Sequence, residues 1–216
     1  TNIRKTYDDV IDIGCGDGNL LKKLSKIADS CIGILPSVEE KKIVENLVKP
    51  FSNIKISYGF STKTNLIDNS ADLVICNSVL HGIGFNKNIV EESIKEFYKK
   101  IKRGGILYVG EIPNKNEMEG RNYGVSFFKY LIWATKNRGL FFAFEQLKEY
   151  FFCLFSKKGY TIQPPEQYYC SKSLFVDLLK KNNYKVLAIY DFLNNKEVTS
   201  KNVKKATRLD YLCIKE

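Results

Sequence analysis

The stretch that decides the fold reads VIDIGCGDGNL and spans residues 10–20. An apolar run ends in three glycines at alternate positions, Gly14, Gly16 and Gly18, and apolar residues at helical spacing follow. This pattern predicts a buried strand, a tight turn and the start of a helix. Glycine suits such a turn because it adopts positive φ and lets a ligand come close to the backbone. The free N–H groups at the helix start favour polar or anionic ligand groups.

Length and composition predict one domain covering residues 1–216. The chain is long enough for a full core without metal or disulfide bonds, and its 44% hydrophobic and 27% charged residues are typical of a globular protein. Six cysteines are scattered without a C-x-x-C motif, which indicates free thiols in a reducing compartment. No segment resembles a signal peptide or is long enough to span a membrane. We therefore expect a cytoplasmic protein.

The positive charge is unevenly distributed. Of the net charge of +10, residues 1–112 contribute +2 and residues 113–216 contribute +8. Such an excess fits anionic partners, namely phosphates, nucleic acid or a membrane surface. It also fits a general bias toward Lys and Asn, with the extra lysines simply exposed on solvent-facing helices. We favour this second interpretation, in which the charge has no specific partner.

Strands and helices alternate along the first half of the chain. After the first helix, the sequence predicts a helix at 37–48, a helix at 86–101 closed by Gly104 and Gly105, and strands at residues 31–35, 54–58, 72–76 and 106–110. Ser37 and Glu40 form a capping box at the start of the first of these helices, whose expected inner face is Val38, Ile43, Val44 and Leu47. This order predicts an α/β protein with a parallel sheet.

The second half begins with a break in this pattern and ends in two strands. Residues 114–170 hold two aromatic-rich segments with helical spacing, 125–134 and 140–155. A helix then runs from Ser171 to about residue 182 with an expected inner face of Leu174, Leu178 and Leu179. The closing strands, 184–191 and 206–214, have no helix between them, which predicts an antiparallel hairpin.

The inserted region has three interpretations. We favour a helical lid over a substrate. Because Lys and Arg residues flank its Phe and Trp residues, 125–158 also suits peripheral contact with a membrane surface. In the third interpretation, its aromatic side chains simply complete the core.

Four motifs together resemble the class I S-adenosylmethionine-dependent methyltransferases: the turn from Asp12 to Gly18, the strand DLVIC at 72–76, NSVLH at 77–81 and RGGILYVGE at 103–111. The resemblance covers about residues 8–112 well and 171–216 in outline. It implies a three-layer, Rossmann-like, seven-stranded and mostly parallel sheet whose last strand is antiparallel, with the helical insertion after strand five. It also implies S-adenosyl-L-methionine as cofactor, bound over the carboxyl ends of strands one to four, in agreement with the general rule for open α/β sheets.

The resemblance also implies which residues bind the cofactor. The glycine turn would hold its amino-acid part, and Asn77 would lie near the methyl group. Leu35 stands where the family usually has an acidic residue for the ribose, and Phe60 where it often has Asp for the adenine; Phe60 is suited to stack on the adenine face instead. The full expected set is Asp12, Gly14, Cys15, Gly16, Gly18, Leu35, Pro36, Phe60, Ser61 and Asn77.

Two residues are candidates for catalysis. His81 is the only histidine, follows the fourth predicted strand and has an ordinary pKa suited to a general base; its plainer role is to pack or cap the loop. Glu111, at the end of strand five, is a second base or an orienting group, or else an ordinary loop carboxylate. The substrate candidates in or beside the insertion are Arg121, Tyr123, Tyr168 and Tyr169.

The sequence therefore predicts a metal-independent S-adenosylmethionine-dependent methyltransferase of a small molecule. By family analogy we expect an oxygen acceptor, with a sugar or glycan-precursor hydroxyl first. There is no carboxylate–histidine cluster at metal-ligand spacing. Two alternatives stay open: an inactive methyltransferase-like fold that acts as a binding module, and a methyltransferase of RNA or another anionic partner. The sequence contains no recognisable RNA-binding module, which weighs against nucleic acid as the substrate. The oligomeric state is not predicted.

Overall fold

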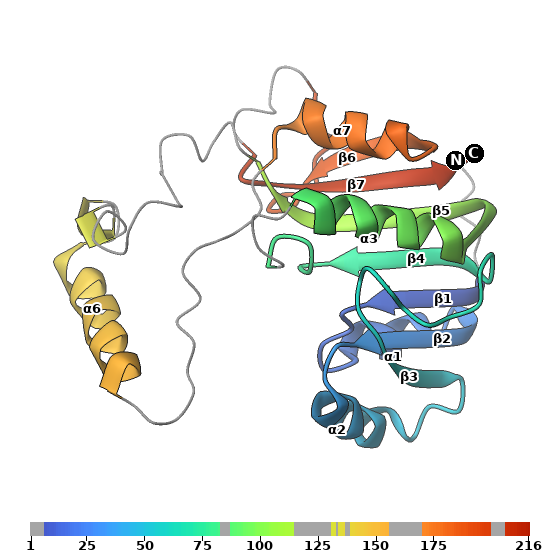
Figure 1. Cartoon of the computed structure of the whole chain (residues 1–216), viewed down its shortest axis with the longest axis horizontal. Helices are drawn as coiled ribbons and strands as arrows, with labels where there is room; N and C mark the ends of the chain where they lie inside the picture. Colours follow the sequence, from blue (N-terminus) through green and yellow to red (C-terminus); the bar gives the residue numbers. More distant parts are fainter. Residues whose placement is uncertain are drawn as a thin grey trace.

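A seven-stranded sheet forms the centre of the molecule (Figure 1). The computed structural model describes residues 7–82, 87–114, 131–132, 134–136, 139–155, 170–199 and 206–216. The strands are β1 (Tyr7–Ile13), β2 (Ala28–Leu35), β3 (Ile54–Tyr58), β4 (Ala71–Asn77), β5 (Ile101–Pro113), β6 (Tyr184–Asp191) and β7 (Arg208–Lys215). The helices are α1 (Asn19–Leu24), α2 (Val38–Val48), α3 (Lys87–Lys100), α6 (Leu140–Phe155) and α7 (Lys172–Lys181).

The strand order is β3-β2-β1-β4-β5-β7-β6. Strands β1 to β5 pair in parallel, while β7 is antiparallel to both β5 and β6. The predicted mostly parallel sheet with an antiparallel last strand is confirmed, as is the closing hairpin. The order reverses at β1, because β2 lies on one side of it and β4 on the other, and open α/β sheets bind ligands at such a point.

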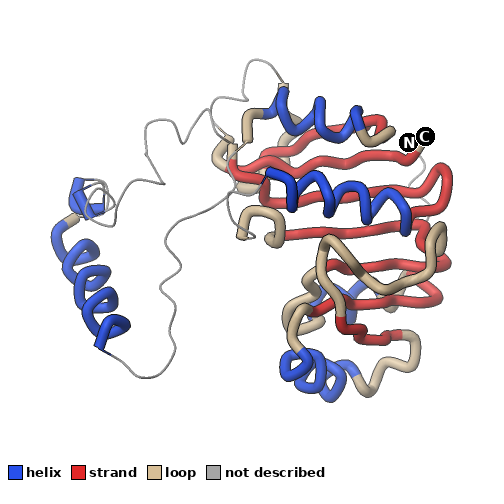
Figure 2. The backbone as a smooth tube through the Cα atoms, viewed as in Figure 1, coloured by secondary structure: helices blue, strands red, loops and turns tan. Residues whose placement is uncertain are grey.

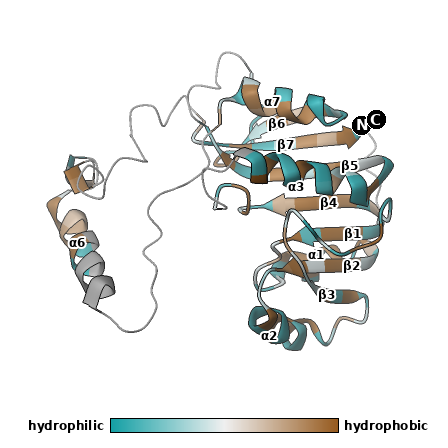
Figure 3. Ribbon diagram, in the orientation of Figure 1, coloured by the Kyte–Doolittle hydropathy of each residue, from teal (hydrophilic) through white to brown (hydrophobic). Residues whose placement is uncertain are grey.

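Helices cover both faces of the sheet (Figure 2). The side chains of the strands alternate between two apolar clusters. On one face, Phe97 of α3 and Phe175 of α7 pack with Ile11 and Cys76 of the sheet. On the other, Leu21 of α1 and Val44 of α2 join a cluster with alternate strand residues such as Val10 and Ile75. Much of β4 and β7 is correspondingly apolar (Figure 3). The expected three layers are therefore present.

Two predicted helix faces are wrong in part. On α2, Val44 is buried but Val38, Ile43 and Leu47 are exposed, and the buried partner of Val44 is Val48, one turn away. Only one stripe of α2 meets the sheet near its β3 edge, so the second apolar stripe faces water. On α7, Leu174 is exposed and Phe175 takes the expected inner position beside Leu178 and Leu179.

Strand β5 is longer than predicted. It begins at Ile101, directly after α3, and continues to Pro113. Gly104 lies inside it with a φ of 75°, next to an irregularity in the pairing of β4 with β5. A bulge that needs a glycine therefore replaces the predicted helix-ending loop.

The helical spacing predicted at 140–155 is confirmed by α6. Figure 1 shows α6 beyond the edge of the sheet toward which β1, β2 and β4 point. Most of the other aromatic-rich segment, 125–134, lies outside the described residues, and the role of 114–170 as a lid stays a prediction. Of the helices that the structure describes, none has the length and apolarity to cross a bilayer. Buried free thiols are found at Cys15, Cys31, Cys76, Cys170 and Cys213.

Candidate functional site

The glycine turn joins β1 to α1 at the carboxyl end of the parallel strands. Gly14, Gly16 and Gly18 have φ values of 72°, 52° and 75°. The Gly14 amide donates to the Ile34 carbonyl at 2.9 Å, which ties the turn to β2, and the Gly18 amide donates to the Cys15 carbonyl at 3.0 Å. The predicted strand, turn and helix start are confirmed.

The three glycines serve two different purposes. A Cβ on Gly14 would clash with Cγ2 of Val79, and one on Gly18 would lie 2.9 Å from Cγ1 of Val48. These two positions are filled by the protein's own packing. At Gly16, by contrast, nothing lies within 4 Å of the place where a Cβ would stand. The middle of the turn therefore leaves an open stretch of backbone that a ligand can approach.

Beside this turn lies a buried carboxyl group. Asp12 is almost fully buried, and burial raises its pKa to about 7. Its negative charge contributes to the raised pKa of the Cys15 thiol, about 12, although burial of Cys15 is the larger cause. Cys15 is therefore an uncharged packing group. A cation placed next to Asp12 would stabilise the carboxylate, and an amino-acid ammonium group has this chemistry.

The predicted nucleoside residues lie at the ends of β2 and β3. Leu35 is 3% exposed and belongs to the apolar cluster with Val44 and Val48, so its side chain is a core group. Phe60 is 47% exposed and meets Tyr58 edge to face at 5.6 Å between ring centroids. An exposed aromatic ring at this end of the sheet suits stacking on a planar base.

Helix α3 holds the segment that carries Phe60, Ser61 and the rest of residues 59–70. The Ser93 hydroxyl donates to Ser61 at 2.9 Å. One turn further along α3, Oε1 of Glu96 accepts from the amide and hydroxyl of Thr64 at 2.9 and 2.8 Å. Because Glu96 and Thr64 are buried, this contact fixes the middle of the segment. Ser61 thereby sits against α3, and Pro36 is exposed after β2.

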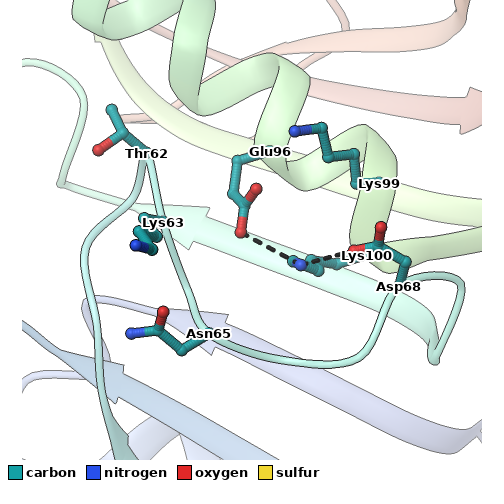
Figure 4. Close-up of a pocket in the computed structure, with 7 residues that line it drawn as sticks. All are labelled: Thr62, Lys63, Asn65, Asp68, Glu96, Lys99 and Lys100. Atoms are coloured by element: carbon teal, nitrogen blue, oxygen red, sulfur yellow. Dashed lines mark hydrogen bonds and ion pairs between the residues drawn. The ribbon is translucent and has the colours of Figure 1, made fainter.

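Below this contact, a surface pocket of about 400 Å³ opens between α3 and residues 59–70 (Figure 4). Lys100 lies in its wall and bridges Asp68 at 2.6 Å and Glu96 at 3.3 Å. Its ammonium group is thus satisfied within the protein, and hydrogen bonds from Thr64 and Lys100 lower the pKa of Glu96 against its burial. We interpret the pocket as the solvent-facing side of the contacts that hold residues 59–70 against α3, and not as a ligand site.

The predicted methyl-side residues meet at the ends of β4 and β5. Asn77 lies against the Gly110 backbone and donates from Nδ2 to Oε1 of Glu111 at 3.5 Å. Glu111 has a φ of 61°, and its amide donates to Oδ1 of Asp210 at 2.8 Å. Its other carboxylate oxygen forms an ion pair with Arg208. Two donors therefore already engage the Glu111 carboxylate.

His81 belongs to the same group of charges. It is half-buried, and its Nδ1 atom is buried without a hydrogen-bond partner among the described residues. Burial, followed by the Arg208 guanidinium, lowers the pKa of His81, and Glu111 opposes that shift. The imidazole is therefore neutral at neutral pH and able to accept a proton.

Sequence reasoning missed three members of this group, namely Arg208, Asp210 and Tyr108. Burial and the neighbouring Asp210 raise the pKa of Tyr108, and burial raises that of Asp210. Tyr108 lies on β5 itself, but only the antiparallel pairing of β5 with β7 brings Arg208 and Asp210 to Glu111, so no local spacing reveals those two. The predicted substrate residues Arg121, Tyr123, Tyr168 and Tyr169 lie outside the described residues.

The chain is similar to known methyltransferases in sequence and in fold. A family model described as a methyltransferase domain matches residues 11–109, which include the turn, β4 and most of β5. Residues 11–109 therefore match a methyltransferase domain. Its sheet extends through β6 and β7 in the seven-stranded order described above.

Relatives of this methyltransferase domain are distant. The chain is 28% identical over 114 residues to the mitochondrial ubiquinone biosynthesis O-methyltransferase of Mus musculus, covering 50% of this chain and 30% of that relative. The chain thus spans about a third of the length of the curated relatives it matches.

Solved structures are similar over nearly the whole chain. An S-adenosylmethionine-dependent methyltransferase from Mesorhizobium loti has a TM-score of 0.64 at 13% identity, covering 98% of this chain and 92% of that one. The N-methyltransferase NodS from Bradyrhizobium japonicum, in complex with S-adenosyl-L-homocysteine, has a TM-score of 0.62 at 11% identity, covering 97% and 79%. At these identities the similarity concerns the fold.

Proposed function

We propose that this protein is an S-adenosylmethionine-dependent methyltransferase that transfers a methyl group to an oxygen of a small molecule, with His81 as the general base. The observation that carries the proposal is the pairing of an open glycine turn with a neutral imidazole at the same edge of the sheet. Gly16 leaves its backbone free, and His81 has an unengaged Nδ1. The open backbone at Gly16 is suited to the cofactor, and the imidazole of His81 is suited to the methyl acceptor.

The residues present fit the cofactor. Gly14, Gly16 and Gly18 would hold its amino-acid part, with the buried Asp12 as the counter-charge for an ammonium group. Phe60 offers an exposed ring for the adenine. Leu35 cannot accept hydrogen bonds from the ribose, so each missing bond to a charged acceptor weakens binding by about 1.5–3 kcal/mol, less where water substitutes. We therefore expect weaker cofactor binding than an acidic residue at this position would give.

The chemistry requires a proton acceptor. The cofactor supplies a methyl group on a sulfonium, and an attacking hydroxyl must lose its proton as the new carbon–oxygen bond forms and the carbon–sulfur bond breaks. His81 is neutral and takes that proton. Glu111 is engaged by Arg208 and Asn77, which suits it to orienting neighbours instead.

An oxygen acceptor is favoured because the mouse relative is named an O-methyltransferase. Among oxygen acceptors, a sugar or other glycan-precursor hydroxyl is the first class to screen, a choice that rests on analogy. Because NodS is named an N-methyltransferase, amines form the necessary comparison set.

Calorimetry with S-adenosylmethionine and S-adenosyl-L-homocysteine tests the cofactor half of the proposal. Heat that saturates at micromolar to millimolar ligand supports it. No heat at millimolar ligand would overturn it and leave a methyltransferase-like fold that acts as a binding module. If the cofactor binds, a screen of hydroxyl and amine acceptors with detection of S-adenosyl-L-homocysteine tests the acceptor half.

A further inference from the structure

Helix α6 exposes a row of large apolar side chains. Leu140, Phe141 and Phe144 are 77%, 79% and 62% exposed, and their spacing places them on one side of the helix. Ala143, which borders this row, is buried. Figure 1 shows that this helix stands apart from the sheet. Contiguous exposed apolar surface of this kind usually marks an interaction site.

The sequence on either side of this row carries a net positive charge. Residues 125–158 contain 11 of the 28 aromatic residues of the chain, together with six Lys or Arg and two Glu. One of those two, Glu145, is paired with Lys148 at 3.8 Å, while Lys136 is exposed near the start of α6. Aromatic and basic residues in this combination favour the headgroup region of a bilayer that carries anionic lipids.

We propose that α6 docks on the surface of an anionic lipid bilayer, lying in the interface with Leu140, Phe141 and Phe144 toward the acyl chains. The 16 residues of α6 are too few to span a bilayer, which needs about 20 apolar residues, so the helix lies on the surface. A second copy of the chain would bring the same positive charge to the contact, whereas an anionic bilayer neutralises it. This docking places the site described above close to a membrane and is independent of which acceptor the protein uses.

Flotation of the full chain with vesicles tests the proposal. One set of vesicles is phosphatidylcholine alone and the other contains phosphatidylglycerol as well. We expect the chain to float with the second set only, and less at high salt. The double variant Phe141→Ser, Phe144→Ser should lower the partition coefficient at least about tenfold, because each loses its apolar contact with the acyl region.

A matched control is available on α2, where Ile43 and Leu47 are 61% and 48% exposed. The variant Ile43→Ser, Leu47→Ser should float as the wild type does. Equal loss in both variants, equal flotation with both kinds of vesicle, or no flotation would overturn the proposal. A Phe141→Ser, Phe144→Ser variant that floats normally but loses turnover would also overturn it and would indicate a lid. The same variant changing from dimer to monomer in size-exclusion chromatography would overturn it as well and would indicate a contact between two copies. Calorimetry with S-adenosyl-L-homocysteine on the same variants keeps this test separate from that of the proposed function.

Discussion

Arg208, the first residue of β7, forms an ion pair with Glu111 of β5, 97 residues earlier in the chain. The pair lies beside His81, and Arg208 acts on that imidazole as a repelling cation while Glu111 acts as an attracting anion. Glu111 therefore acts on the pKa of His81 through its charge. Burial is the main cause of the lowered pKa of His81, and the balance between the two charges adjusts it further.

Replacing Arg208 with Gln should move the acid limb of the pH–rate profile to higher pH. The change removes a cation that lowers the pKa of His81 and leaves the opposing charge of Glu111 uncompensated. Measurement of kcat/KM against pH checks this. Glu111→Gln is the reciprocal variant and should move the limb to lower pH. An identical shift in both variants would mean that packing, not charge, governs the profile.

Replacing His81 with Ala should lower kcat by about 10²–10⁴-fold, the usual contribution of a general base. Affinity for S-adenosyl-L-homocysteine, measured by calorimetry, should change little because the glycine turn is untouched. His81→Gln serves as a bulkier control that keeps a polar group but no base. Full turnover in either variant removes His81 from the mechanism.

Replacing Asp12 with Asn should stabilise the free protein at neutral pH and above. The pKa of Asp12 is raised from 3.8 to about 7 in the folded state. Between these values the folded protein keeps a proton that the unfolded chain has released, so stability falls as pH rises through this window. The gain in the variant should be at most about 4 kcal/mol above pH ~8 and disappear below pH ~4. Urea denaturation at several pH values measures it.

The same carboxyl group should couple cofactor binding to proton release. If the ammonium group of the cofactor sits beside Asp12, binding favours the carboxylate and expels a proton near pH 7. Calorimetry in buffers of different ionisation enthalpy reports that proton. The Asp12→Asn variant should bind more weakly and release none. Proton release that persists in this variant would assign it to another group.

Replacing Glu96 with Gln should loosen residues 59–70. The buried carboxylate accepts two hydrogen bonds from Thr64 and pairs with Lys100, so we expect a loss of about 1–3 kcal/mol in the free energy of unfolding. Because the same segment carries Phe60, cofactor affinity should fall as well. Glu92→Gln, at an exposed position on the same helix, is the control and should leave both quantities unchanged.

Replacing Leu35 with Asp tests the ribose position. The family pattern alone predicts tighter cofactor binding, but Leu35 is a core side chain beside Val44 and Val48. An unpaired carboxylate there should destabilise the free protein by about 3–5 kcal/mol, and added cofactor should recover part of the loss if the new group reaches the ribose. Leu35→Met should be tolerated. Thermal unfolding with and without S-adenosyl-L-homocysteine distinguishes the two effects.

The parallel part of the fold was predictable because its signals are local. The run at residues 10–20 specifies a strand, a turn and a helix start within a few residues, and the strand at 72–76 is apolar throughout, as expected where both faces are covered. The inner faces of α2 and α7 were predicted less well. Periodicity locates an apolar stripe, but only tertiary packing decides which of two adjacent stripes meets the sheet.

The site was predictable on the β1 and β4 side and not on the β7 side. Gly16 and His81 stand next to strand ends that the sequence marks clearly. Arg208 and Asp210 reach the site only because β7 inserts between β5 and β6, and single-sequence patterns carry no signal for a pairing between distant strands. The burial that raises the pKa of Asp12 is likewise a tertiary effect.

The insertion of β7 between β5 and β6 has a consequence for biosynthesis. Until residues 208–215 have left the ribosome, β6 has no partner and the edge of β5 presents unpaired backbone groups to its surroundings. The growing polypeptide can therefore assemble the half that contains the glycine turn early, yet the charge arrangement around the imidazole arises only after β7 has been synthesised. A nascent chain stalled before that step would be an incomplete sheet, exposed to chaperones and to aggregation.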